Sequence, residues 1–470
     1  MLTVRVYFCH YEWNWSRSLK MKEEQNEFRG SNFRFWDSLS ENEKAEQIMK
    51  SKSKIGVHSE IGKLRKVFLH SPGQEVELMT PRNASELLYN DIIYYKNIVA
   101  GHAQLKSVLS LVSTVLEVSE CLEEVLEISQ AREQLLDQIL AFQGCPELKT
   151  ELQSFSSSDL VQTLLTGVTL KRNSLESWLS SKTFSLVPLP NMYFMRDTSM
   201  VVGNRVIASR MASSVRYAES LIMRTIYEYH PELKGHGLLL DAAYGEVDPK
   251  FTIEGGDILV ISEDLLLVGI SERTTPKAVD ALVNALIRAR AEDGNQEPFN
   301  VLCVILPRER STIHLDMIFT VANKEQAVVY SPYVLGRERA RVVRIRVKPD
   351  GDKKFKEVED LILGLRSVGV RMDPIPCGGD EPLHQQREQW NSGANLFSFA
   401  PGKVISYIHE HTLRACESAG FKIMSAKDVI KHPTLLQSNY PLIVTVEGSE
   451  LSRGGGGPRC MTCPVLRDSV

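Results

Sequence analysis

The sequence predicts an α/β protein in which one unit, a β-hairpin followed by a helix and a strand, recurs along the chain. Strand patterns that flank turn-forming residues predict four hairpins, at 199–208, 257–269, 316–330 and 395–407. Helical patterns follow at 214–229, 275–293, 355–368 and 410–418, and further strands at 300–306, 370–376 and 421–424. Because the hairpins are unevenly spaced, we interpret them as degenerate copies of one unit and not as a fixed-period solenoid.

The N-terminal part of the chain divides in two. Residues 1–53 hold three of the five tryptophans and then a polar stretch with little apolar periodicity. We interpret them as an N-terminal extension, partly disordered or derived from an incorrect start site. The globular part, 54–470, begins with a predicted strand at 63–69, which would supply a fifth copy of the unit.

A helical subdomain is predicted at about 84–180. Leucine, isoleucine and valine recur at helical spacing between Leu122 and Leu140, and Gly144 ends this pattern. Residues 158–167 form a second segment of the same kind, with a serine at its start and a glycine at its end.

Composition limits the class of protein. The chain has 470 residues and a formal net charge of -4, which argues against a general nucleic-acid binder. No apolar run approaches the roughly 20 residues of a membrane helix, and residues 1–10 lack the basic and apolar regions of a signal peptide. The eight cysteines form no disulfide scaffold, and several lie in apolar runs, so we expect a cytoplasmic protein.

The C-terminal segment carries the strongest chemical signal. Four glycines, at 454–457, precede Cys460 after only a proline and an arginine. A run of glycines suggests that the backbone approaches another group closely. Arg453 and Arg459 could favour the thiolate form of Cys460, which is the nucleophilic form.

Cys460 and Cys463 together form a Cys-x-x-Cys pair, which raises other interpretations. A thioredoxin-like motif should open a helix after an early strand, and a structural zinc site needs further ligands at metal spacing. Gly-rich loops also bind phosphate, but no Gly-Lys-Ser/Thr follows here. We therefore interpret Cys460 as a lone nucleophile and Cys463 as a bystander.

Polar residues gather where the predicted units begin or end, at 191–197, 254–257, 314–316 and 377–380. If 314–316 is extended, His314 and Asp316 point the same way and could pair a base with a carboxylate. Plainer interpretations stay open. His314 could be a satisfied histidine at a strand end, Glu254 and Asp257 could cap a turn, and Asp197 could form a surface ion pair.

Taken in order, these clusters resemble the arginine deiminase family. The resemblance extends from about residue 55 to 470. The segments that carry it are 56–67, 71–73, 191–197, 254–257, 269–274, 314–316, 387–391 and 453–463. No single segment is decisive, but the ordered set is highly specific.

The resemblance implies a five-bladed α/β propeller of pseudo-fivefold ββαβ units, the pentein fold, with an inserted α-helical bundle. Residues 54–470 would then be the catalytic domain. It also implies L-arginine as substrate, citrulline and ammonia as products, no metal or cofactor, and a homo-oligomer.

The resemblance also implies a role for each matching residue. Cys460 would be the nucleophile and His314 the general acid and then base. Asp197 and Asp316 would hold the guanidinium of the substrate, with Glu254 supporting it and His314. The substrate carboxylate would be bound by Asn191, Arg216, Arg273 and, less securely because Arg459 competes for the role, Arg453.

Two alternatives remain. The chain could be another guanidine-modifying enzyme, such as a methylarginine hydrolase or an amidinotransferase, although the helical insertion and residues 387–391 argue against this. It could also be a non-catalytic arginine-binding protein, although every catalytic position is present.

Overall fold

The computed structural model describes residues 55–244, 248 and 250–470. The prediction for residues 1–53 therefore lies outside the described residues. The unit Ile55–Val470 is a mixed α/β structure and is considered by itself.

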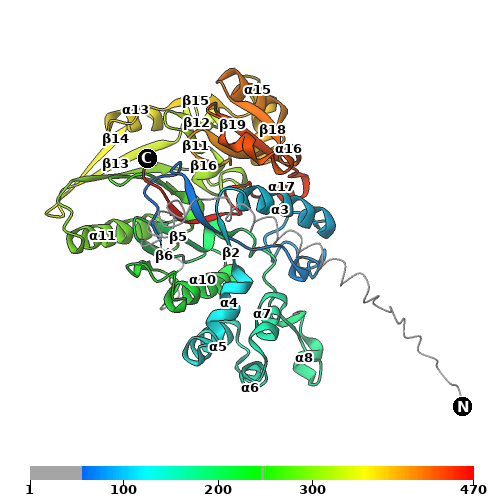
Figure 1. Cartoon of the computed structure of the whole chain (residues 1–470). Helices are drawn as coiled ribbons and strands as arrows, with labels where there is room; N and C mark the ends of the chain where they lie inside the picture. The colour runs from blue at the N-terminus through cyan, green and yellow to red at the C-terminus, as the bar shows by residue number, and fades with distance from the viewer. Residues whose placement is uncertain (1–54, 245–247, 249) are drawn as a thin grey trace, which may run out of the picture. The chain divides into compact units, whose positions relative to one another are not determined.

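Five sheets share one pattern, in which two antiparallel strands are followed by a strand parallel to the second (Figure 1). In four of these sheets the antiparallel pairs are β5 (Ser199–Val202) with β6 (Arg205–Ala208), β8 (Ile258–Ser262) with β9 (Leu265–Ile270), β11 (Phe319–Asn323) with β12 (Gln326–Val329), and β16 (Phe397–Ala400) with β17 (Lys403–Tyr407). The parallel partners are β7 (Leu238–Asp241), β10 (Phe299–Ile305), β15 (Asp373–Pro376) and β19 (Leu442–Val446). The four predicted hairpins are thus confirmed.

The fifth sheet joins the two ends of the described chain. Strand β1 (Leu64–Leu69) pairs antiparallel with β20 (Cys463–Arg467), so that Phe68 lies opposite Cys463. Its other edge pairs in parallel with β2 (Thr114–Glu117). Sequence patterns predicted β1 but not β20, because a C-terminal strand that pairs with the start of a domain has no hairpin turn to reveal it.

Helices connect the second and third strands of each pattern. They include α10 (Tyr217–Tyr229), α11 (Pro276–Glu292) and α15 (Glu410–Ser418), close to the predicted segments. The predicted helix at 355–368 is wrong over its first part. Residues Lys353–Val358 form strand β14, which pairs with β13 (Arg341–Val347) to extend the β8–β10 sheet, and α13 begins only at Leu361. No residue of β14 is buried, so this segment is a strand because it pairs with β13, and Asp360 caps α13.

The segment 84–180 is mostly helical. It contains α3 (Tyr95–Ser110), α4 (Val118–Leu126), α5 (Ser129–Gln143), α6 (Lys149–Gln153), α7 (Ser157–Thr166) and α8 (Leu175–Leu179). Gly144 ends α5 in the left-handed region at φ 71°, and Ser156 caps α7 through the backbone N–H of Asp159. Helices α4 and α5 pack against α10, whereas α3 packs against β2 and the C-terminal helices α16 (Ala426–Lys431) and α17 (Ser449–Arg453).

The cores of the sheets are apolar and buried. Val206 and Ile207 of β6 belong to one buried cluster with Leu221 and Ile222 of α10, so this helix covers its own sheet. None of the described helices combines the length and apolar character needed to cross a bilayer.

Candidate active site

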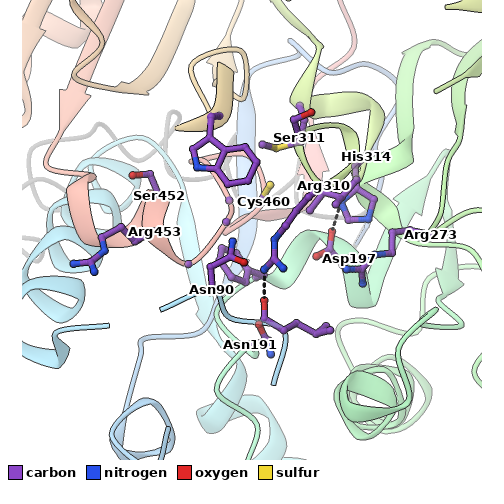
Figure 2. A pocket seen from close by; sticks show the side chains of 18 of the residues that line it. Asn90, Asn191, Asp197, Arg273, Arg310, Ser311, His314, Ser452, Arg453 and Cys460 are labelled. Atoms are coloured by element: carbon purple, nitrogen blue, oxygen red, sulfur yellow. Dashed lines mark hydrogen bonds and ion pairs between the residues drawn. The ribbon is translucent and has the colours of Figure 1, made fainter. Parts of the chain in front are cut away.

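Three of the polar clusters of the sequence, at 191–197, 254–257 and 314–316, meet because each lies just before the first strand of a sheet. Asp197 belongs to α9 (Met195–Thr198), directly before β5. Glu254 and His314 precede short 3₁₀ turns, Gly255–Asp257 and Leu315–Met317, that lead into β8 and β11. Cys460 precedes β20 in the same way. Asp197, His314 and Cys460 line one cavity of about 580 Å³ (Figure 2).

Cys460 is 3% exposed, and its Sγ lies 3.9 Å from Oδ2 of Asp316. The side-chain oxygen of Asn395 accepts hydrogen bonds from the backbone N–H groups of Arg459 and Cys460, at 3.1 and 3.2 Å, and so fixes the segment. Burial raises the pKa of the Cys460 thiol well above its ordinary value, and the charges of Asp316 and Asp197 raise it further. At neutral pH the Cys460 thiol is therefore neutral.

His314 lies between two carboxylates. Its Nε2 is 2.9 Å from Oε2 of Glu254, and its Nδ1 is 3.7 Å from Oδ1 of Asp197. Burial alone would lower the pKa of His314, but the negative charges of Asp197, Glu254 and Asp257 outweigh it and raise the pKa to about 9. At neutral pH His314 is therefore a cation and can donate a proton.

A glycine allows the imidazole to lie this close to its neighbours. A Cβ placed on Gly256 would come within 2.5 Å of the His314 ring. Residue 256 thus has to be glycine because the backbone of the 255–257 turn runs directly beneath the imidazole.

The structure changes the interpretation of His314 and Asp316. His314 precedes a 3₁₀ turn, Leu315–Met317, and Asp316 lies within it, so neither is in a strand, and their partners differ. His314 contacts Glu254, whereas Asp316 contacts Cys460 and accepts a 2.8 Å hydrogen bond from Arg459. Period-two geometry fails here because the strand β11 begins only at Phe319.

Asp257 supports this turn from below. Its Oδ1 accepts the backbone N–H of Leu315, at 2.9 Å, and its Oδ2 accepts a 2.6 Å hydrogen bond from Ser271. Burial raises the pKa of Asp257 to about 7. The open interpretation that Glu254 and Asp257 bind backbone N–H groups is thus also correct, since Glu254 accepts from Ala212 at 2.8 Å.

Arg216 forms an ion pair with Asp197, so its guanidinium is not free in the cavity. Its guanidinium donates to Oδ2 of Asp197 at 2.6 Å and to Glu219 at 2.9 Å, and it also contacts the backbone oxygens of Phe194 and Asn191. Asn191 lines the same part of the cavity, and its amide donates to the backbone oxygen of Leu87. Asp197 therefore does not pair with the adjacent Arg196.

Arg273 connects the buried and exposed parts of the cavity. Its guanidinium is 3.8 Å from Oε1 of Glu254 and 3.5 Å from Glu272. Burial alone would raise the pKa of Glu254, but the charges of Arg273 and His314 lower it to about 2. Glu254 therefore stays ionised throughout the physiological range.

Arg459 and Arg453 occupy opposite environments. Arg459 is 1% exposed and bonds Asp316 and Glu60 beneath the cavity, which it does not line. Arg453 lines the cavity mouth, is exposed, and pairs with Asp91 and Glu450. Figure 2 shows the Arg453 side chain pointing away from Cys460.

We call the buried residues beneath and beside the thiol the floor: Asp197, Glu254, His314, Asp316, Arg459 and Cys460. We call the exposed residues that line the cavity mouth the rim: Asp91, Glu272, Arg310, Trp390 and Arg453. Every residue of the floor except Arg459 was selected from the sequence as catalytic, and Arg459 was considered as a rival to Arg453.

Sequence reasoning missed Arg310. Its guanidinium donates to the backbone oxygen of Leu88 at 2.9 Å, and among the described residues it forms no ion pair. It lies four residues before His314, so a search of the residues flanking the histidine could have found it. Glu60 was also missed, although it lies within the segment 56–67 that carries the family resemblance.

The structure gives two different reasons why residues 455 and 456 are glycines. Gly455 adopts φ 97°, in the left-handed region that favours glycine. A Cβ on Gly456 would come within 2.5 Å of the Phe194 ring and 2.9 Å of Cβ of Cys460. Both residues line the cavity, so the run shapes its wall.

Cys463 has no place in this cavity. It begins β20, is fully buried, and its Sγ contacts Tyr227 and the backbone oxygen of Ser199. Both Cys460 and Cys463 are free thiols.

The second Gly-Gly-Asp segment, 378–380, forms a turn with positive φ at both glycines and does not line the cavity.

One group of side chains could reach a metal ion. Among the described residues, only Asp197, Glu254 and His314 bring three histidine, cysteine or carboxylate donor atoms within 4.8 Å of one another. Nε2 of His314 and Oε2 of Glu254 already bond each other, which fits a proton-transfer pair.

Comparison with known proteins identifies the family. The family model described as arginine deiminase matches residues 85–467. Arginine deiminases of Listeria monocytogenes serovar 1/2a and of Bacillus cereus are each 32% identical to this chain. The matches cover 90% and 89% of this chain, respectively, and 100% of each relative.

Solved structures show weaker likeness. An amidinotransferase from Microseira wollei, SxtG, is 15% identical with a TM-score of 0.48 over 89% of this chain and 98% of its own. A dimethylarginine dimethylaminohydrolase adduct with S-methyl-L-thiocitrulline is 12% identical with a TM-score of 0.44, over 86% and 100% of the two chains. With such TM-scores the assignment rests on the sequence relatives, and on that basis the chain belongs to the arginine deiminase family.

Proposed function

We propose that the protein hydrolyses L-arginine to L-citrulline and ammonia through a covalent intermediate on Cys460. One observation carries the proposal. Oδ1 of Asp197 and Oδ1 of Asp316 are buried without a hydrogen-bond partner among the described residues, near the thiol. Buried polar atoms are costly to leave unpaired, and a guanidinium offers five N–H donors in one plane. The relatives are named arginine deiminase, which supports arginine as the source of that guanidinium.

The opposite end of the substrate would be recognised by cationic groups. Arg216, Arg273 and Arg310 line the cavity together with Asn191. Arg216 is already paired with Asp197 and Glu219, so it would take the substrate carboxylate only by giving up one of these pairs. Arg310 needs no such exchange, because it has no carboxylate partner among the described residues. Arg453 would reach the substrate only if residues 453–456 move inward.

Substrate binding prepares the nucleophile. A neutral thiol with a raised pKa is unreactive, but a bound guanidinium brings a positive charge next to Sγ and favours the thiolate. The thiol proton leaves to solvent or to a carboxylate, and the thiolate attacks the guanidinium carbon. The C=N electron pair moves to nitrogen, which gives a tetrahedral intermediate.

His314 then acts twice. As a cation it donates a proton to the departing amine, the C–N bond breaks, and ammonia leaves. Now neutral, His314 takes a proton from water, whose oxygen attacks the same carbon. The C–S bond breaks to release citrulline and to restore the thiol, and one water is consumed for each ammonia formed.

We also propose that the five sheets are the blades of a closed five-bladed propeller, with residues 54–470 as the catalytic domain. The shared strand pattern of the sheets supports this arrangement, and so does the position of the site residues before first strands in at least four of them.

The test is a product assay on the purified full chain. We expect equal amounts of citrulline and ammonia from L-arginine, and turnover of agmatine and dimethylarginine that is weaker by orders of magnitude. Agmatine lacks the carboxylate and would lose its contacts with the cations that line the cavity, at a cost of about 2–5 kcal/mol. Folded protein that binds arginine calorimetrically but releases no ammonia would contradict the proposal, as would a preference for dimethylarginine.

A further inference from the structure

Two charged residues beneath the cavity take no part in the reaction scheme, Glu60 and Arg459. Arg459 uses its whole guanidinium in one orientation. Nε donates to Oε2 of Glu60 at 3.0 Å, and one terminal nitrogen donates to Oε1 of Glu60 at 3.1 Å and to the backbone oxygen of Ile258 at 2.8 Å. The other terminal nitrogen donates to Oδ2 of Asp316 at 2.8 Å.

We propose that Glu60 and Arg459 are positioning residues for Asp316. Glu60 fixes the plane of the Arg459 guanidinium, and Arg459 holds one carboxylate oxygen of Asp316 so that the other is free for the substrate. The inference deepens the proposed function, because it explains how one of the two guanidinium acceptors is oriented.

The geometry supports this division of labour. Oδ2 of Asp316 contacts both Arg459 and the Cys460 thiol, whereas Oδ1 is buried without a partner among the described residues. A carboxylate held through one oxygen cannot rotate without breaking a charge-assisted hydrogen bond. Fork-to-fork pairing between arginine and glutamate adds geometric restraint that a lysine could not supply.

Glu60 is itself fixed from the far side. Its Oε1 accepts the backbone N–H of Val260 in β8 at 3.1 Å, and it lies in the turn before β1. The three residues therefore come from the start of the described chain, from the loop before β11, and from the segment before β20. This joins the nucleophile segment to two other sheets.

The charges fit the same role. Burial alone would raise the pKa of Glu60, but Arg459, Arg196 and Arg467 lower it to about 2, so Glu60 remains an anion. Burial raises the pKa of Asp316, and the charge of Arg459 opposes that shift. Without Arg459, Asp316 would take up a proton more readily and would accept hydrogen bonds from a cation less well.

Other groups around Asp316 and Cys460 could also shift a titration. Six other side chains either shift the pKa of Glu60, Asp316 or Cys460 or have their own pKa shifted by one of them. They are Asp197, His314, Arg196, Arg467, Tyr193 and Tyr407. None of them is altered in the variants below.

The first measurement separates charge from geometry in steady-state kinetics on L-arginine. We expect E60Q and R459K each to lower kcat/KM about tenfold or more, mainly through KM, because the fork is broken. E60D keeps the charge at the wrong distance and should show a similar rise in KM. The control is E117Q, which removes another buried glutamate, 2.7 Å from Lys106, that does not line the cavity.

The second measurement is independent of arginine turnover. We follow the pH dependence of Cys460 alkylation by iodoacetamide in the C463A background. Loss of the Glu60 anion in E60Q should lower the pH midpoint, and loss of the cation in R459M should raise it. E60D and R459K keep the charges and should leave the midpoint near that of the parent.

A purely structural pair would give a different pattern. In that case E60Q and E117Q would lose similar stability, and E60Q would keep its KM within about twofold and its alkylation midpoint unchanged. That result would overturn the inference. If the wild-type protein does not hydrolyse arginine, but E60Q and R459M shift the pH midpoint of Cys460 alkylation in opposite directions, only the proposed function is contradicted.

Discussion

The floor and the rim of the cavity use the same residue types in opposite ways. On the floor, each charged group is buried and meets an opposite charge from a distant segment, as Asp316 meets Arg459 and Glu254 meets His314. On the rim, Arg453 is exposed and pairs with Asp91 and Glu450, and Arg310 has no carboxylate partner among the described residues. Charges on the floor are buried and held in place, whereas rim charges are exposed, and Arg310 has no ion pair to give up before it meets a ligand. The floor should therefore govern chemistry, and the rim should govern which molecules enter.

The largest effect should come from removing the nucleophile. We expect C460A to lose at least ~10⁴-fold in kcat, since residues that act as a unit in covalent catalysis show losses of this size. C463A is the matched control, because its sulfur contacts only Tyr227 and Ser199 in the core. If C463A lost as much activity as C460A while remaining folded, the assignment of Cys460 as the lone nucleophile would fail.

Removing a carboxylate from the floor should affect both catalysis and stability. D197N should lower kcat/KM by about 100-fold, because an oriented acceptor for the guanidinium is lost. It should also lower the free energy of unfolding by about 3 kcal/mol, because Arg216 stays buried with one partner fewer. Kinetics and urea denaturation measure the two effects. D293N is the control, as it breaks an ion pair with Arg205 away from this cavity.

Neutralising Glu254 should move the pH profile. His314 donates a proton in the proposed reaction, so activity should fall as pH rises through its pKa of about 9. E254Q removes a charge that raises this pKa, so the alkaline limb of kcat should move to lower pH. A limb that stays at the wild-type pH would show that another group is the acid.

The same shift has a consequence for stability. The folded-state pKa of His314 lies above its ordinary value of 6.5, so its contribution is fully present below pH 6.5 and is lost as pH rises through about 9. Unfolding measured across that window should show a smaller decline for E254Q than for the wild type.

A change on the rim should alter binding more than chemistry. R310A should raise KM for arginine about tenfold, equivalent to about 1.4 kcal/mol, with kcat little changed. The exposed neighbour Arg308 does not line the cavity, so R308A is the matched control. The weak reaction with agmatine should be unaffected by R310A. An equal loss with agmatine would mean that Arg310 does not bind the carboxylate.

The smallest effect should be that of R453A on stability. Its ion pairs with Asp91 and Glu450 are exposed, and such pairs contribute less than about 1 kcal/mol. Thermal unfolding should therefore barely change. A rise in KM as large as that of R310A would show that residues 453–456 move to bring Arg453 onto the substrate.

The sequence predicted local structure correctly where turn-forming residues and a periodic apolar pattern are neighbours in the chain. The four hairpins and the helices α10, α11 and α15 were correct because each is specified by neighbouring residues. The helix predicted at 355–368 was wrong in its first part, because pairing of β14 with β13 overrides local propensity. The roles of the selected site residues remain predictions, but the structure brings four of them together around the Cys460 thiol.

By itself, the sequence determined the order of polar clusters, the position of Cys460 after a glycine run, and the family to which the chain belongs. Only the tertiary structure decided that Arg459 lies beneath the thiol with Glu60 while Arg453 lies at the mouth, although both flank the same glycines. The tertiary structure also decided that Arg216 pairs with Asp197 and that Arg310 has no carboxylate partner among the described residues. The physical reason is that charge pairing depends on distance and burial in space, and the partners lie from 19 to 399 residues apart along the chain.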